Sequence, residues 1–162
     1  MSVFSGVRIG ESASSRWSIP FSIGEGQSDV KPSIHLVGEP PQWLTPVAMR
    51  IAELAALPTV DPRGSRELNL YDVVDALKFI VRVMRDDTVP PWIGRLASGG
   101  IQLTWQAGDV EVEAVFDRAR GDREILVSVG ENEWDAPADE ADSLFATVID
   151  RLSASHFEQA SA

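Results

Sequence analysis

The fold of this protein is decided by the stretch from Gly99 to Phe116, which reads GGIQLTWQAGDVEVEAVF. Apolar and polar residues alternate on both sides of Gly108, and this period of two is typical of a strand with one buried face. Ala107-Gly108-Asp109 supplies a turn in which glycine can adopt a positive φ. The stretch therefore predicts a β-hairpin with one apolar and one polar face.

A third strand is predicted immediately after this hairpin. Ile125, Val127 and Val129 recur at every second position after a loop that contains Gly121. Three consecutive strands joined by short turns predict an antiparallel meander. Trp105 falls on the apolar side of the meander, so we expect it to be buried.

Three helices are predicted around the meander from capping residues and apolar spacing. The first begins at Thr45-Pro46 and ends near Leu57, before Pro58. The second is capped by Asn69, and its apolar stripe consists of Leu70, Val73, Val74, Leu77, Ile80, Val81 and Met84. Phe79 falls off this stripe and is predicted to be a second core contact or a partner contact. The third begins near Asp135-Ala136-Pro137, and its stripe consists of Ala141, Leu144, Phe145, Val148, Ile149 and Leu152.

These elements predict an α+β fold. An antiparallel meander of three to five strands is covered on one face by two or three amphipathic helices. Residues 45–154 form the single domain in this interpretation, and residues 155–162 form a frayed tail. Residues 1–44 form an N-terminal extension with short strands, predicted at 3–9, 17–23 and 34–37, or a partly ordered arm.

The composition narrows the class of protein. The chain has 162 residues, of which 44% are hydrophobic and 24% charged, so one globular domain with a real core is expected. The absence of cysteine excludes disulfides, thiolate metal sites and cysteine nucleophiles. No signal peptide and no membrane-spanning stretch is recognisable, so we expect a soluble, cytoplasmic protein.

The charge is acidic and unevenly spread. Fourteen basic residues stand against 25 acidic ones, and the last 68 residues carry −9 of the net charge of −11. This balance argues against direct binding to nucleic acid. The acidic half is interpreted either as a solvated surface that aids solubility or as a surface for a basic partner.

No motif for catalysis, cofactor binding or metal binding is present in the sequence. The two histidines, His35 and His156, have no metal-ligand spacing and no serine nucleophile motif beside them. Neither GxGxxG nor GxxxxGK[ST] occurs. We therefore predict no catalytic residue, no cofactor and no metal site, and we expect a protein that is not an enzyme.

The candidate binding residues lie on the polar face of the hairpin. Glu111 and Glu113 are two apart on a strand, so their side chains share one face about 7 Å apart. Gln102 and Thr104 join them on this face in the predicted register. The alternative interpretation is a solvated face without a binding role.

Aromatic residues supply further candidates for a protein interface. Trp17, Phe21 and Trp134 are predicted to contact a partner, because tryptophan is enriched at binding hot spots.

The stretch from Ile51 to Glu113 resembles a family of short, largely uncharacterised bacterial proteins. That family has a GWDGxGA-like loop and a hairpin that reads GG-[IV]-QLEW…LEIE. Gly99-Gly100-Ile101-Gln102-Leu103-Thr104-Trp105 matches this hairpin, with Thr104 in place of glutamate. In the loop, Asp61, Gly64 and Ser65 match, whereas Val60 replaces the family's tryptophan. The resemblance implies an accessory protein of mobile or defence regions, in some cases part of a toxin–antitoxin-like gene pair.

These observations lead to one expected function and two alternatives. We expect a protein-binding module, an antitoxin-like or accessory component of a bacterial two-gene or defence system. Its partner would be the neighbouring gene product, or a second copy in a homodimer. The first alternative is an inhibitor that mimics nucleic-acid charge. The second is a small hydrolase or transferase, which requires carboxylates that converge in a pocket with raised pKa values.

Overall fold

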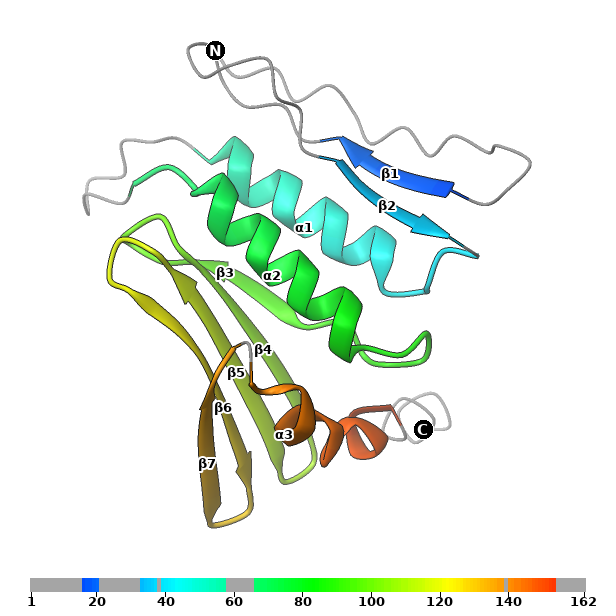
Figure 1. The fold of residues 1–162 in the computed structure, drawn as a ribbon, viewed down its shortest axis with the longest axis vertical. Helices are drawn as coiled ribbons and strands as arrows, with labels where there is room; N and C mark the ends of the chain where they lie inside the picture. Colours follow the sequence, from blue (N-terminus) through cyan, green and yellow to red (C-terminus); the bar gives the residue numbers. More distant parts are fainter. Residues whose placement is uncertain (1–15, 21–32, 38, 58–65, 139, 154–162) are drawn as a thin grey trace.

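The computed structural model describes residues 16–20, 33–37, 39–57, 66–138 and 140–153, and Figure 1 shows their arrangement. Two strands, β1 (Arg16–Pro20) and β2 (Ser33–Val37), precede the helices α1 (Leu44–Ala56) and α2 (Leu70–Val83). The remaining elements are β3 (Trp92–Arg95), β4 (Ile101–Ala107), β5 (Val110–Asp117), β6 (Asp122–Val129), β7 (Asn132–Pro137) and α3 (Asp142–Ala146). Residues 149–153 are also helical.

The main sheet is an antiparallel meander, as predicted. Its five strands follow one another in the order β3-β4-β5-β6-β7, and every neighbouring pair is antiparallel. The predicted hairpin is β4–β5, and its turn contains Gly108 with φ +59°. β1 and β2 pair only with each other, as a separate two-stranded sheet. They correspond to two of the three short strands predicted in the N-terminal segment; the third, at 3–9, lies outside the described residues.

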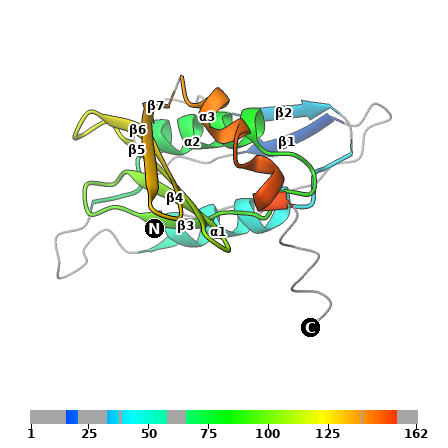
Figure 2. The ribbon, with the colours of Figure 1, turned by 90° about the horizontal axis from the view of Figure 1, so that it is seen from below.

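The three helices lie on one side of the five-stranded sheet (Figures 1 and 2), which confirms the α+β class. The core between the layers is built by the inward residues of β3 to β6 and by the helix stripes, and Ala136 of β7 packs against its margin. Trp105 is buried, as expected. Within the described residues no helix is long and apolar enough to cross a membrane.

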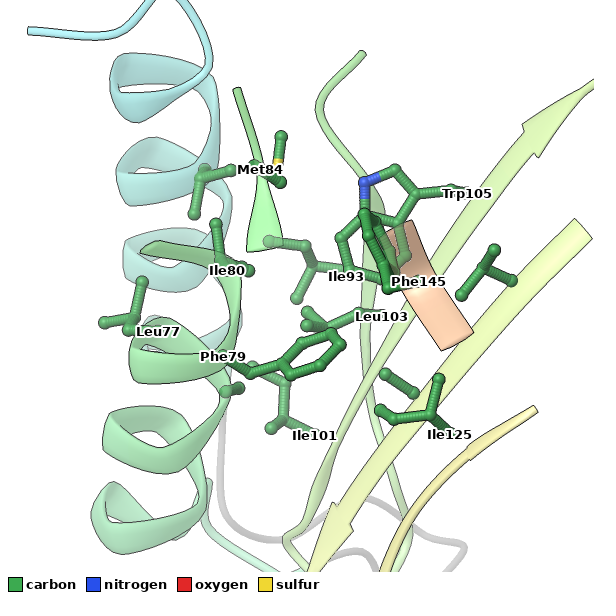
Figure 3. Close-up of a cluster of buried hydrophobic side chains, with 14 of the residues drawn as sticks. Leu77, Phe79, Ile80, Met84, Ile93, Ile101, Leu103, Trp105, Ile125 and Phe145 are labelled. Atoms are coloured by element: carbon green, nitrogen blue, oxygen red, sulfur yellow. The ribbon is translucent and has the colours of Figure 1, made fainter. Parts of the chain in front are cut away.

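Phe79 occupies the centre of this core. Its ring contacts those of Trp105, Phe116 and Phe145 at centroid distances of 5.8 to 6.3 Å. Figure 3 shows Phe79 among the buried side chains of the sheet. Of the two predicted roles, the structure supports the core contact. The prediction of a single stripe was too narrow, because α2 packs against β4, β5 and α3 and therefore buries a wide arc of its surface.

The predicted start of the first helix, with Thr45 as the N-cap and Pro46 as the first helical residue, was wrong by two residues. Trp43 is the N-cap, and Thr45 and Pro46 lie in the first turn. A proline is tolerated there, because the first N–H groups of a helix have no intrahelical partner. In α2, by contrast, Asn69 is the cap as predicted, and its side-chain oxygen accepts a hydrogen bond from the N–H of Tyr71 at 2.9 Å.

The prediction for residues 135–137 was also wrong. Asp135, Ala136 and Pro137 end strand β7 instead of starting a helix, and α3 begins at Asp142. Strand pairing with β6 dominates over the cap-like signal, because six residues of β7 pair with β6. The apolar positions of the third predicted stripe are nevertheless inside, since five of its six residues are buried and Leu144 packs against the core.

The double glycine at the start of β4 has a packing role. Gly99 has φ +92°, a conformation that side chains disfavour, and it lies against the main-chain oxygen of Glu67. At Gly100, a Cβ atom would come within 2.7 Å of the oxygen of Phe116. The two glycines therefore allow the β3–β4 loop to lie close to β5 and to the segment before α2.

Candidate partner-binding face

The side of the main sheet that points away from the helices is polar and acidic; we call it the open face. Residues that alternate with the core positions project from it. Thr104 lies opposite Glu113, and Gln106 lies opposite Glu111, as the predicted register requires. Glu124 on β6 and Glu133 and Asp135 on β7 project to the same side, because they alternate with Ile125, Val127 and Trp134.

None of the five carboxylates on the open face forms an ion pair within the described part of the chain. Four of them are exposed and Glu113 is half-buried; the set is Glu111, Glu113, Glu124, Glu133 and Asp135. The five strands contain two basic residues, and the register places both on the helix side, with Arg95 opposite Ile101 and Arg123 opposite Phe116. The open face of these strands therefore carries negative charge without compensation.

The acidic residues on the helix side behave differently. Asp142 pairs with Arg82 at 2.6 Å, and Asp109 pairs with Arg151 at 3.2 Å. Asp75 pairs with two arginines, Arg118 and Arg123. These three carboxylates are thus partly neutralised, whereas the five on the open face have no basic partner among the described residues.

The five carboxylates without ion pairs are spaced so that none of them lies directly opposite another. Asp117 and Asp122 do lie opposite each other at the end of β5 and β6, and Asp117 has Arg120 beside it. Glu113 is flanked across the strands by Thr104 and Leu126, and Glu133 lies opposite Ser128. Like charges directly opposite one another destabilise a sheet. This spacing reduces the repulsion, so the face can hold five acids without basic partners.

Trp92 projects from the same face at the edge strand β3. It is directly opposite Thr104, and 59% of its surface is exposed. Its six-membered ring covers Gly94, where an added Cβ would come within 2.6 Å of Trp92 Cζ3. Gly94 is therefore the position that allows the indole to lie against the sheet while its outer side remains in solvent.

A small apolar area separates Trp92 from the acids of β7. Val115 lies between Gln102 and Glu124, and Leu126 lies between Glu113 and Asp135. Both side chains are half-buried on a face that nothing covers in the described part of the chain. An apolar centre with a polar margin is the usual composition of a protein interface.

The structure brings together four of the seven predicted binding residues: Gln102, Thr104, Glu111 and Glu113 share the open face. Trp134 is 47% exposed, but it lies opposite Val127 and hence on the other side of the sheet, at the β7 edge. Trp17 belongs to β1, and its side chain is outside the described part of the chain. Phe21 lies outside the described residues altogether.

Sequence reasoning missed Trp92, Glu124, Glu133 and Asp135 as members of this face. For Glu124 the signal was present, because it alternates with Ile125 and Val127. For Glu133 and Asp135 it was hidden by the mistaken helix start. Trp92 lies outside the predicted hairpin, so no alternation pattern placed it on this face, where it is exposed.

A second group of carboxylates gathers at the end of the sheet near the start of α2. Asp72 is buried, although it is not part of the predicted apolar stripe, and it accepts a hydrogen bond from the N–H of Arg118 at 3.2 Å. Asp117 is buried and accepts hydrogen bonds from Ser98 and from the N–H of Ala119. These bonds join α2, the β3–β4 loop and the β5–β6 turn.

Burial raises the pKa of Asp72, and the hydrogen bond and charge of Arg118 oppose this effect. Raised carboxyl pKa values were the signature required of the hydrolase alternative. The hollow beside this group measures about 70 Å³ and is lined by Asp75, Lys78, Phe79, Arg82, Phe116, Arg123 and Ala138. Ligand pockets usually measure about 300–1,000 Å³. The carboxylates here have partners that account for their placement, so we interpret the group as structural.

Within the described residues, no group of three or more His, Cys, Asp or Glu side chains is placed to hold a metal ion. No protein-family model, curated protein or solved structure matches the chain.

Proposed function

We propose that this protein is a non-enzymatic protein-binding module whose open face binds a basic surface of a partner protein. The observation that carries the proposal is a set of five carboxylates without ion pairs on one face of the main sheet. The two arginines of the sheet's strands lie on its other face. Charge complementarity of this kind speeds association and selects the partner.

The dimensions of the open face suit a protein partner. Five strands at about 4.8 Å spacing and about 3.3 Å per residue give a surface of roughly 20 by 25 Å. A standard interface buries about 800 Å² on each partner, which is of the same order. Trp92 provides an exposed aromatic anchor, and Val115 and Leu126 provide an apolar centre.

The biological setting follows from the sequence resemblance. We propose an antitoxin-like or accessory role in a bacterial two-gene or defence system, with the neighbouring gene product as the partner. The test is co-expression of the two proteins, followed by purification through a tag on one of them at about 50 mM and about 300 mM salt. A complex that forms at low salt and weakens at high salt supports the proposal. A complex that is insensitive to salt, or no complex, contradicts it.

A second candidate function is supported by the gathering of acids on one face. An inhibitor that mimics nucleic acid would present carboxylates where its target binds phosphates. The discriminating measurement adds a short DNA or RNA duplex to the purified complex. Displacement of this protein by the duplex supports mimicry. A complex that remains intact in the presence of the duplex supports the first proposal.

A further inference from the structure

Strand β7 forms one edge of the main sheet, and its outer side is uncovered in the described part of the chain. It is last in the strand order, and Asn132, Glu133, Trp134 and Asp135 are all exposed. Figure 1 shows β7 at the border of the sheet, away from α1 and α2. An edge strand presents main-chain N–H and C=O groups to any strand that can pair with it.

The hydrogen-bond pattern shows which groups of β7 are available. The N–H of Ala138 donates to the carbonyl oxygen of Arg123 at 2.9 Å, one position beyond the Pro137–Glu124 pair. Antiparallel pairs alternate between bonded and non-bonded. Trp134 and Ala136 therefore bond towards β6, while Glu133 and Asp135 direct their N–H and C=O groups outward. Pro137 has no N–H.

We propose that the outer edge of β7 accepts an extended basic segment of the partner as a sixth strand. This inference rests on the proposed function and adds the form of the partner's contact. The residues opposite Glu133 and Asp135 would place arginine or lysine side chains beside those two carboxylates on the open face. The residue between them would lie on the side of Trp134 and would be apolar.

Charge selects this occupant over a second copy of the chain. Two antiparallel β7 strands centred on Trp134 would place Glu133 of one copy directly opposite Asp135 of the other, and like charges in that position are destabilising. Charged residues and proline on an edge are a general protection against self-pairing. In a basic strand, the side chains opposite Glu133 and Asp135 would be positively charged and would attract the two carboxylates. Strand addition to a sheet edge would then be favoured.

The test uses a peptide of about nine residues in which arginine and valine alternate, long enough to span β7. Hydrogen exchange of the main-chain amides is followed by NMR with and without the peptide. The expected result is new protection of the Glu133 and Asp135 amides. A control peptide with N-methylated arginine amides keeps the charge but cannot complete the ladder, and it should give no such protection. Absence of protection with the first peptide overturns the proposal.

A pair of variants separates main-chain pairing from charge. Both D135P and D135N remove the carboxylate, but only D135P removes an outward N–H, and proline is tolerated at such edge positions. D135P should bind the arginine–valine peptide roughly fivefold more weakly than D135N. Equal binding by the two variants contradicts strand addition. If E111Q/E113Q weakens co-purification of the neighbouring gene product while D135P and D135N behave alike, the proposed function stands and this inference fails.

Discussion

The six-membered ring of Trp92 covers Gly94, so that the indole is held against the open face with its outer side in solvent. The next residue on the same face of β3 is this glycine, so the ring rests on the backbone of its own strand. Fixed, partly exposed aromatic residues are common centres of binding energy.

Removal of Trp92 should weaken the complex with the neighbouring gene product. W92A is expected to cost about 2 kcal/mol of binding free energy, or roughly thirtyfold in Kd, measured by calorimetry. G94A should also weaken binding, because the new methyl group displaces the ring while the backbone of Gly94 has no positive φ. M49A, a change of an exposed residue on α1, is the control. Equal affinity of all four proteins would remove Trp92 from the interface.

Asp72 should make a pH-dependent contribution to stability. Its pKa is raised by burial, so the folded protein holds this proton more tightly than the unfolded chain. The stabilisation is therefore present at low pH and is lost as the pH rises through the raised pKa. The free energy of unfolding of the wild type minus that of D72N should fall as the pH rises above the ordinary carboxyl pKa of 3.8, measured in urea titrations. A difference that instead grows with pH would show that the ion pair with Arg118 outweighs burial.

Phe79 should be among the most costly core residues to truncate. It contacts three other aromatic rings and is 1% exposed. F79A is expected to lower the free energy of unfolding by about 3–5 kcal/mol, through lost burial and the cavity left behind. F79L should cost less, and M49A should change stability by less than about 0.5 kcal/mol. A loss below about 1 kcal/mol for F79A would contradict the central packing of this ring.

The double glycine should tolerate no side chain. G99A requires a positive φ and brings a methyl group against the oxygen of Glu67, and G100A meets the oxygen of Phe116. Each is expected to lower the free energy of unfolding by about 1–3 kcal/mol, measured by thermal or urea unfolding. G108A shares a positive φ but has nothing within 4 Å, so it should cost less than G99A. Equal losses of stability for G99A and G108A would mean that the contact with Glu67 does not contribute to the cost of G99A.

The sequence was sufficient to predict the hairpin and its open face, because successive side chains of a strand point to opposite faces of the sheet. Glu111 and Glu113 could be placed beside Gln102 and Thr104 from the turn at Gly108 alone. The class of fold followed from the same pattern and from the helix stripes, and it is confirmed.

The remaining features depend on contacts between distant segments. Asp72 is inside because the β5–β6 turn brings the N–H of Arg118 to it, 46 positions along the chain. Asp135-Ala136-Pro137 carries a helix-start signal, yet pairing with β6 makes it a strand. Trp92 could not be placed on the open face before its register with Thr104 was known.

We propose that the carboxylates of the open face that lack ion pairs bind the partner. The decisive comparison is between two triple variants with the same net charge, one on the open face and one elsewhere on the exposed surface: E111Q/E113Q/E124Q and E39Q/E53Q/E140Q. The measurement is the Kd for the neighbouring gene product at about 50 mM and about 300 mM salt.

The open-face variant should bind at least about tenfold more weakly at low salt, and its binding should respond less to salt, with unchanged or higher folding stability. The second variant should stay within about twofold of the wild type. Equal weakening by the two variants would contradict the claim, because the acidic residues would then act only through total charge.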